Sequence, residues 1–189
     1  MTELTDRFDD ALAYASRIHR TQYRKGTTIP YVSHVLAVSS LTLQYGGDED
    51  QAIGALLHDA AEDQGGQDRL DDIRSRFGDA VASIVADCTD SWVEPKPVWR
   101  ARKEQYIASL AHKPERSLLV SLADKTHNAS AILDDLREHG DALWDRFTGG
   151  REGSLWYYRS LADVLGNRLS GPLARDFDRT VTAIEAVAR

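Results

Sequence analysis

The sequence contains little of what stabilises or targets several common classes of protein. Its 189 residues include a single cysteine, Cys88, which excludes an intramolecular disulfide and a cysteine-based zinc cluster. No apolar stretch approaches the roughly 20 residues that a transmembrane helix needs. Residues 1–10 are acidic and lack an apolar h-region, so we expect no secretory signal. Together these features predict a protein of the reducing cytoplasm, with no membrane partner.

Positive charge is also scarce, since 23 Lys and Arg residues stand against 30 Asp and Glu residues, a formal net charge of −7. Broad binding to nucleic acid requires a basic surface, so we expect no nucleic-acid partner. A small anionic ligand is compatible with this charge, because exposed charges are screened beyond about 8 Å at physiological salt. A few local cations and a metal can outweigh the global sign.

Strand signals are almost absent, and apolar residues recur at helical spacing along nearly the whole chain. Glycine, proline and capping residues divide this pattern; Asp48 and Gln51, for example, have the spacing of a capping box. We expect helices at residues 5–20, 30–45, 48–64, 71–77, 79–88, 100–112, 114–139, 142–147, 155–165 and 172–189, with irregular loops at 91–99 and 149–153. No repeat or linker interrupts them, so the prediction is one all-α domain over residues 1–189, a bundle of roughly eight to ten helices.

One apolar stretch, residues 55–63 (ALLHDAAED), concentrates side chains that bind metals or transfer protons. His58 and Asp59 are adjacent, and each is followed four residues later by an acidic residue, Glu62 and Asp63 respectively. A continuous helix would therefore stack His58 over Glu62 and Asp59 over Asp63. Charged groups at the edge of a core are costly unless they are paired or bind a metal. The alternative is a helix end that turns polar on leaving the core, and only the rest of the chain can decide between the two.

Three further stretches hold more polar chemistry than packing requires. Arg24 and Lys25 precede the second expected helix, His34 lies near its start, and residues 120–128 (VSLADKTHN) turn an apolar helix polar at Asp124. Imidazole and carboxylate together suit divalent transition metals such as Mn, Fe, Zn, Co or Ni. A site with positions left for water and substrate would have the ligands His34, His58, Asp59 and Asp124.

These stretches, in the order H…HD…D with the acidic pair and the basic loop, resemble the HD-domain phosphohydrolases. The resemblance is closer to one branch, the hydrolase domain of RelA/SpoT homologues and the small alarmone hydrolases. Its motifs span about residues 8–166, and residues 167–189 add a C-terminal helix. The resemblance implies a divalent metal, with Mn²⁺ expected, held by His34, His58, Asp59 and Asp124.

The resemblance also implies roles for the remaining polar residues. Glu62 and Asp63 would serve the attacking water and the leaving group. Arg24 would lie against a guanine base with Lys25 nearby, and ribose or phosphate would be contacted by Lys125 and Asn128. The implied reaction removes pyrophosphate from the 3′ position of ppGpp or pppGpp and leaves GDP or GTP, so a guanine nucleotide is the expected partner.

Three departures from the family pattern bear on the substrate. Ala131 stands where the family usually has a threonine, Val35 stands where a proline is common, and residues 27–29 lengthen the basic loop. Two alternatives stay open: an HD hydrolase of another phosphorylated nucleotide, such as a nucleotide or NADPH phosphatase, and a nucleotide-binding regulator without turnover. No nucleophilic Ser or Cys motif competes with metal-assisted hydrolysis. The oligomeric state is left open.

Overall fold

The computed structural model describes residues 2–92 and 97–188, so the loop expected at residues 91–99 lies partly outside the described range. Over that range the chain is helical, and its one β feature is an isolated bridge between Tyr23 and Pro30. The predicted all-α class is therefore confirmed. The elements are α1 (Asp6–Ile18), α2 (Val32–Gln44), α3 (Glu49–Leu57), α4 (Ala60–Asp63), α5 (Gly66–Phe77), α6 (Asp79–Cys88), α7 (Trp99–Ser109), α8 (Glu115–His139), the 3-10 helix η1 (Gly140–Arg146), α9 (Gly150–Arg168) and α10 (Pro172–Val187).

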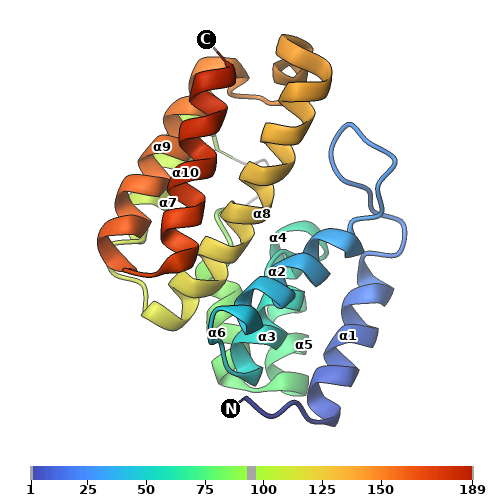
Figure 1. Cartoon of the computed structure of the whole chain (residues 1–189). Helices are drawn as coiled ribbons and strands as arrows, with labels where there is room; N and C mark the ends of the chain where they lie inside the picture. The colour runs from blue at the N-terminus through green and yellow to red at the C-terminus, as the bar shows by residue number, and fades with distance from the viewer. Residues whose placement is uncertain (1, 93–96, 189) are drawn as a thin grey trace.

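Two groups of helices meet along α8 (Figure 1). Helices α1 to α6 enclose one apolar cluster, which includes Ile53, Leu57 and Phe77. A second cluster includes Leu118 and Phe177 and extends into α2, α3 and α6. Helix α8 packs against α2, α3, α6, α9, α10 and η1. One straight element therefore borders both groups, and side chains along it can reach groups from either side.

Helix α8 is 25 residues long and is capped after His139 by Gly140, whose φ of +60° is one that L-residues rarely adopt. At a rise of 1.5 Å per residue its length is about 37 Å. None of the helices in the described residues is long and apolar enough to cross a membrane.

The helix expected over residues 48–64 is wrong at its centre. Its start is as predicted, because Asp48 and Gln51 form a capping box. The helix then breaks at His58 and Asp59, where Asp59 has φ −96° and ψ −1°, in the sparsely populated bridge region. Consecutive side chains of a regular helix point about 100° apart and do not face each other. The break lets the side chains of His58 and Asp59 meet.

The loop expected at residues 149–153 is also wrong, because α9 begins at Gly150 rather than at residue 155. The glycines there serve close packing. A Cβ atom at Gly149 or Gly153 would lie only 2.6 Å or 3.1 Å from the ring of Trp99. Similarly, α5 begins at Gly66, five residues before the expected start, with its first residue at φ +59°. The apolar periodicity of the sequence predicts neither the contact of these glycines with Trp99 nor the turn at Gly66.

The contact between α3 and α6 yields a test of packing. A Cβ atom at Gly54 of α3 would lie 2.7 Å from Cγ2 of Ile84 in α6. We expect Gly54→Ala to lower the free energy of unfolding by about 1–2 kcal/mol, because overpacking outweighs the gain in helix propensity. The matched control is Gly166→Ala in α9, where a Cβ meets nothing within 4 Å. That change should raise stability by about 0.5–1 kcal/mol in urea unfolding. Equal effects of the two substitutions would contradict the packing account.

Candidate active site

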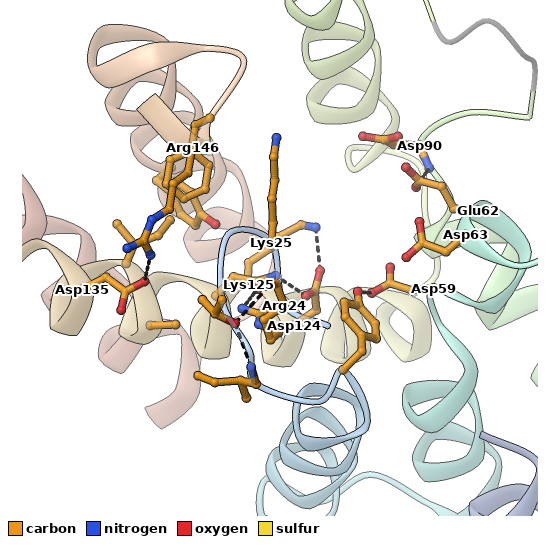
Figure 2. A pocket seen from close by; sticks show the side chains of 18 of the residues that line it. Arg24, Lys25, Asp59, Glu62, Asp63, Asp90, Asp124, Lys125, Asp135 and Arg146 are labelled. Atoms are coloured by element: carbon orange, nitrogen blue, oxygen red, sulfur yellow. Dashed lines mark hydrogen bonds and ion pairs between the residues drawn. The ribbon is translucent and has the colours of Figure 1, made fainter. Parts of the chain in front are cut away.

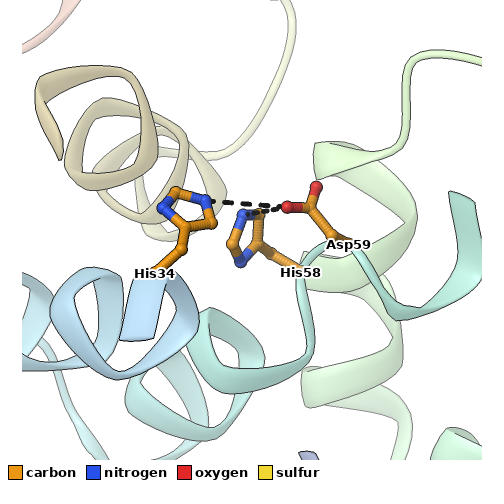
Figure 3. Close-up of side chains that lie close together, drawn as sticks. All are labelled: His34, His58 and Asp59. Carbon is orange, nitrogen blue, oxygen red and sulfur yellow. Dashed lines mark ion pairs between the residues drawn. The ribbon is translucent and has the colours of Figure 1, made fainter. Parts of the chain in front are cut away.

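Four side chains from three parts of the chain converge at one point. His34 comes from α2, His58 and Asp59 from the break between α3 and α4, and Asp124 from α8. His58 Nε2 lies 2.8 Å from Asp59 Oδ2 and 3.6 Å from Asp124 Oδ1. His34 Nε2 lies 3.2 Å from Asp124 Oδ1 and 3.7 Å from Asp59 Oδ2. Figure 3 shows His34, His58 and Asp59, whose ligand atoms all lie within 4.8 Å of one another.

Both imidazole rings present a bare nitrogen to the carboxylates. The Nε2 atoms of His34 and His58 are buried and make no hydrogen bond with the described residues. His58 Nδ1–H donates to the carbonyl oxygen of Ala55 at 2.7 Å, which leaves the lone pair of a neutral ring at Nε2. His34 Nδ1 lies 2.9 Å from His127 Nδ1. Burial is the largest cause that lowers the pKa of His127 to about 4, so a neutral His127 is able to accept a hydrogen bond from Nδ1–H of His34.

The carboxylates are held in place by further donors. Tyr31 donates its hydroxyl hydrogen to Asp59 Oδ2, and burial, reinforced by the charge of Asp59, raises the pKa of Tyr31 so that it stays protonated. Asn128 Nδ2 donates to Asp124 Oδ1, and Lys125 Nζ lies 2.6 Å from Asp124 Oδ2. Burial lowers the pKa of Lys125, but the charge of Asp124, the nearby Tyr157 and Tyr106, and the hydrogen bond to Asp124 together raise it well above its usual range.

This donor set fits a divalent metal. Two carboxylate oxygens and two lone-pair nitrogens face one another, with separations of 2.8 Å and 3.2 Å for the two shortest pairs. All four atoms are hydrogen-bond acceptors, so they need a proton or a cation between them. Burial lowers the pKa of His58, but the charges and hydrogen bonds of Asp59 and Asp124 together raise it well above its usual range, so the site favours a positive charge, either a proton on His58 or a cation beside a neutral ring. A mixed nitrogen and oxygen set suits Mn, Fe, Co, Ni or Zn ions. His127 has the place of a partner that orients a ligating imidazole.

A cavity of about 520 Å³ opens from this cluster and runs along α8 (Figure 2). Asp124, Asn128, Ala131, Ile132 and Asp135 of α8 all line it, at the spacing of one helix face. The 11 helical steps from Asp124 to Asp135 span about 16 Å. The cavity therefore has one end at the histidine–aspartate cluster and a far end at Asp135.

The predicted basic residues line the cavity. Arg24, Lys25 and Lys125 are all on its wall, with Asn128 beside them. Arg24 Nη2 donates to Asn128 Oδ1 at 2.7 Å, which ties the loop between α1 and α2 to α8. Both ends of the Asn128 amide are used, because its nitrogen donates to Asp124. The residues assigned to nucleotide binding from the resemblance therefore lie together beside the metal-ligand cluster.

Glu62 and Asp63 line the cavity wall next to Asp59 (Figure 2). Glu62 Oε2 accepts a hydrogen bond from the backbone N–H of Asp90 at 3.2 Å, and its other oxygen lies 3.7 Å from Arg102 Nη1. Asp63 Oδ2 accepts from the Gln22 side chain at 2.8 Å. The acidic pair is thus positioned by partners from α1–α2, α7 and the end of α6.

Several cavity residues were missed by sequence reasoning. Asp90 pairs with Arg102 and Lys103 of α7, each at 2.5 Å, and Lys103 lies on the cavity wall. Burial raises the pKa of Asp90, but the charges and hydrogen bonds of Lys103 and Arg102 together lower it to about 2. The Asp135–Arg146 ion pair closes the far end. Among these residues, only Tyr31 could have been found from the sequence. It lies three residues before His34, a spacing that places it beside a proposed metal ligand.

Comparison with known proteins places this fold and site in a family. A family model described as HD domain matches residues 11–155. A guanosine-3′,5′-bis(diphosphate) 3′-pyrophosphohydrolase, MESH1 of Danio rerio, is 33% identical over 124 residues, covering 63% of this chain and 65% of that protein. A GTP pyrophosphokinase of Streptomyces antibioticus is 34% identical over 131 residues, which is 67% of this chain. The alignment covers only about 15% of the length of that kinase and of similar relatives.

Two solved structures are similar over most of this chain. One is a metazoan ortholog of SpoT, described as hydrolysing ppGpp and playing a role in starvation responses. It has a TM-score of 0.78 at 29% identity and covers 95% of this chain and 96% of that one. The other is lmo0812 from Listeria monocytogenes, with a TM-score of 0.69 at 27% identity over 86% of this chain and 100% of that one.

The fold and the histidine–aspartate cluster thus define a class of helical proteins, and the chain belongs to the HD domain family. The resemblance read from the sequence, including its RelA/SpoT-type branch, is confirmed by these matches.

The ligand assignment predicts a change in metal binding. His58→Ala removes one of two buried lone-pair nitrogens, so we expect the purified protein to lose stoichiometric Mn²⁺ in equilibrium dialysis. The matched control, His112→Ala, changes an exposed histidine and should keep the metal content of the unaltered protein. His127→Ala should weaken binding by about 10- to 100-fold, as loss of an orienting partner does elsewhere. Full retention of metal by His58→Ala would overturn the ligand assignment.

Proposed function

We propose that this chain is a metal-dependent hydrolase that removes pyrophosphate from the 3′ position of ppGpp or pppGpp, leaving GDP or GTP. The observation that carries the proposal is a single cavity in which a histidine–aspartate cluster lies beside Lys125, Arg24 and Asn128. The names of the similar pyrophosphohydrolases and the similar SpoT ortholog support it. The buried free thiol of Cys88 suits the reducing cytoplasm as the site of action.

In this proposal residues 1–189 act as one HD hydrolase domain, and Mn²⁺ is held by His34, His58, Asp59 and Asp124. Such an ion, when bound, neutralises phosphate oxygens and lowers the pKa of water. The side chains of the protein orient the carboxylates and bind the phosphate groups. Tyr31 and Asn128 fix the two carboxylates by donating to their oxygens. The largely buried ammonium of Lys125 attracts the phosphate groups, together with Arg24 and Lys25, which also line the cavity.

Glu62 and Asp63 are the proposed acid and base. One carboxylate accepts a proton from the attacking water as the oxygen of that water bonds to phosphorus. The bond between phosphorus and the ribose 3′ oxygen then breaks, and a proton is returned to that oxygen. Both carboxylates line the cavity beside Asp59 and are oriented by Asp90 and Gln22, which suits this role.

The proposal is tested by product identity. Purified protein with Mn²⁺ should convert ppGpp to GDP and pyrophosphate, and pppGpp to GTP and pyrophosphate, as resolved by anion-exchange chromatography. The panel should include NADPH and ordinary nucleotides, because Ala131 on the cavity wall replaces the usual threonine. Release of phosphate from one of those compounds, with ppGpp intact, would identify an HD hydrolase of another nucleotide. Binding of ppGpp without any turnover would favour a regulator.

A variant separates chemistry from binding. Glu62→Gln keeps the size of the side chain and removes its charge, so we expect metal content to remain and kcat to fall by about 10²- to 10⁴-fold. Glu152→Gln, an exposed change on α9, is the matched control and should leave kcat unchanged. An unaltered rate in Glu62→Gln would remove Glu62 from the mechanism.

A further inference from the structure

The segment that carries Arg24 and Lys25, residues 23–30, is an ordered hairpin that we call the basic loop. Its two ends are joined by the bridge between Tyr23 and Pro30 and by a hydrogen bond from Arg24 N–H to Ile29 O at 2.8 Å. Inside it, the backbone N–H and the hydroxyl of Thr27 both donate to Arg24 O, each at 3.0 Å. In Figure 1 the loop projects from the end of α1 toward α8. Its internal bonds fix its shape, but they do not fix its position over the cavity.

The tip of the basic loop rests on Arg146 of η1. A Cβ atom at Gly26 would lie 2.9 Å from Cδ, 3.2 Å from Cγ and 3.4 Å from Nε of Arg146. Gly26 also has φ +73°, which only glycine adopts readily. The backbone of the loop thus packs directly against the side chain of Arg146, and a side chain at position 26 would require Arg146 to move.

Arg146 is in turn fixed to α8. Its Nη1 donates to Asp135 Oδ2 at 3.0 Å, and both side chains are about two-thirds buried or more. In the described part of the chain this is the one hydrogen bond of the Arg146 guanidinium. Asp135 lies seven residues after Asn128, which receives the hydrogen bond from Arg24. Two turns of helix separate these positions by about 10 Å on one face of α8.

We propose that the Asp135–Arg146 ion pair is a latch that positions the basic loop over the far end of the cavity. The loop then has two attachments to α8, one through Arg24 and Asn128 and one through Gly26, Arg146 and Asp135. Arg146 is a positioning residue: it acts through Arg24 and Lys25, which face the nucleotide. The role of the loop in binding rests on the proposed function, whereas the latch itself is a property of the free protein.

The latch is tested by limited proteolysis of the full chain without ligand. Trypsin cleaves after Lys25, at the tip of the loop, and the fragment 1–25 is followed by mass spectrometry. Arg146→Ala and Asp135→Asn should each accelerate this cleavage about five-fold, the factor given by loss of an ion pair worth about 1 kcal/mol. The double variant should be no faster than either single one. Arg146→Lys, which can keep the ion pair, should recover part of the protection.

The matched control is Arg137→Ala, which removes another α8 ion pair, with Asp134 at 3.6 Å, that does not touch the loop. It should leave cleavage after Lys25 unchanged. Unchanged cleavage in both Arg146→Ala and Asp135→Asn would overturn the latch, whatever the activity of these variants. So would equal acceleration by Arg137→Ala, since that would indicate general loosening of α8.

Kinetics with ppGpp and Mn²⁺ provide the second readout. Both latch variants should raise KM about five-fold and leave kcat within about two-fold, because the metal-ligand end is untouched. Asp135→Asn is decisive, since it keeps the charge of Arg146 in the cavity. If Arg146 acted by direct contact with the nucleotide, this variant would bind as well as the unaltered protein, and the latch would be refuted. Absence of turnover by the unaltered protein would refute the proposed function, while the trypsin result would still decide the latch.

Discussion

Two buried imidazole nitrogens that face two carboxylates are the constraint on which the rest of the structure depends. Asp59 and Asp124 bring two negative charges to this site. The Nε2 atoms of His34 and His58, which face these carboxylates, have no hydrogen-bond partner among the described residues. An uncompensated buried charge costs several kcal/mol. The nearby Lys125 offsets one charge through Asp124 Oδ2, on the far side of that carboxylate from the imidazoles. A divalent cation at the centre of the four side chains would balance what remains.

The fold supplies this arrangement through one irregular turn and one long helix. The break between α3 and α4 turns two adjacent residues toward the same point, which a regular helix would keep apart. Helix α8 then presents Asp124 to that point and continues past it as the floor of the cavity. Each of the four side chains has a hydrogen-bond partner. Ala55 and Asn128, from the same helices, hold His58 and Asp124, whereas His127 and Tyr31, from other parts of the chain, hold His34 and Asp59. Most of the local structure around the site therefore serves to orient four atoms.

Much of this could be read from the sequence, because helical periodicity and short motifs are local signals. The all-α class, the capping box at Asp48 and the set His34, His58, Asp59 and Asp124 were all predicted, and the structure brings those four residues together. The break at Asp59 could not be predicted, because one residue in a bridge conformation leaves the apolar pattern unchanged. The contacts of Arg146 with Gly26 and Asp135 join segments more than 100 and 10 residues apart, and they depend on how η1 folds back after α8. Lys103 and Asp90 were missed because their ion pair also depends on how separate segments of the chain pack, in this case α7 against the end of α6.

The central claim is that these four side chains share one divalent cation. Crystals of the protein grown with Mn²⁺ and measured for anomalous scattering test it most directly. The account predicts one strong peak within coordination distance of both Nε2 atoms and of one oxygen each from Asp59 and Asp124. A map without a peak there, or with the ion bound elsewhere while both imidazoles keep their present positions, would contradict it.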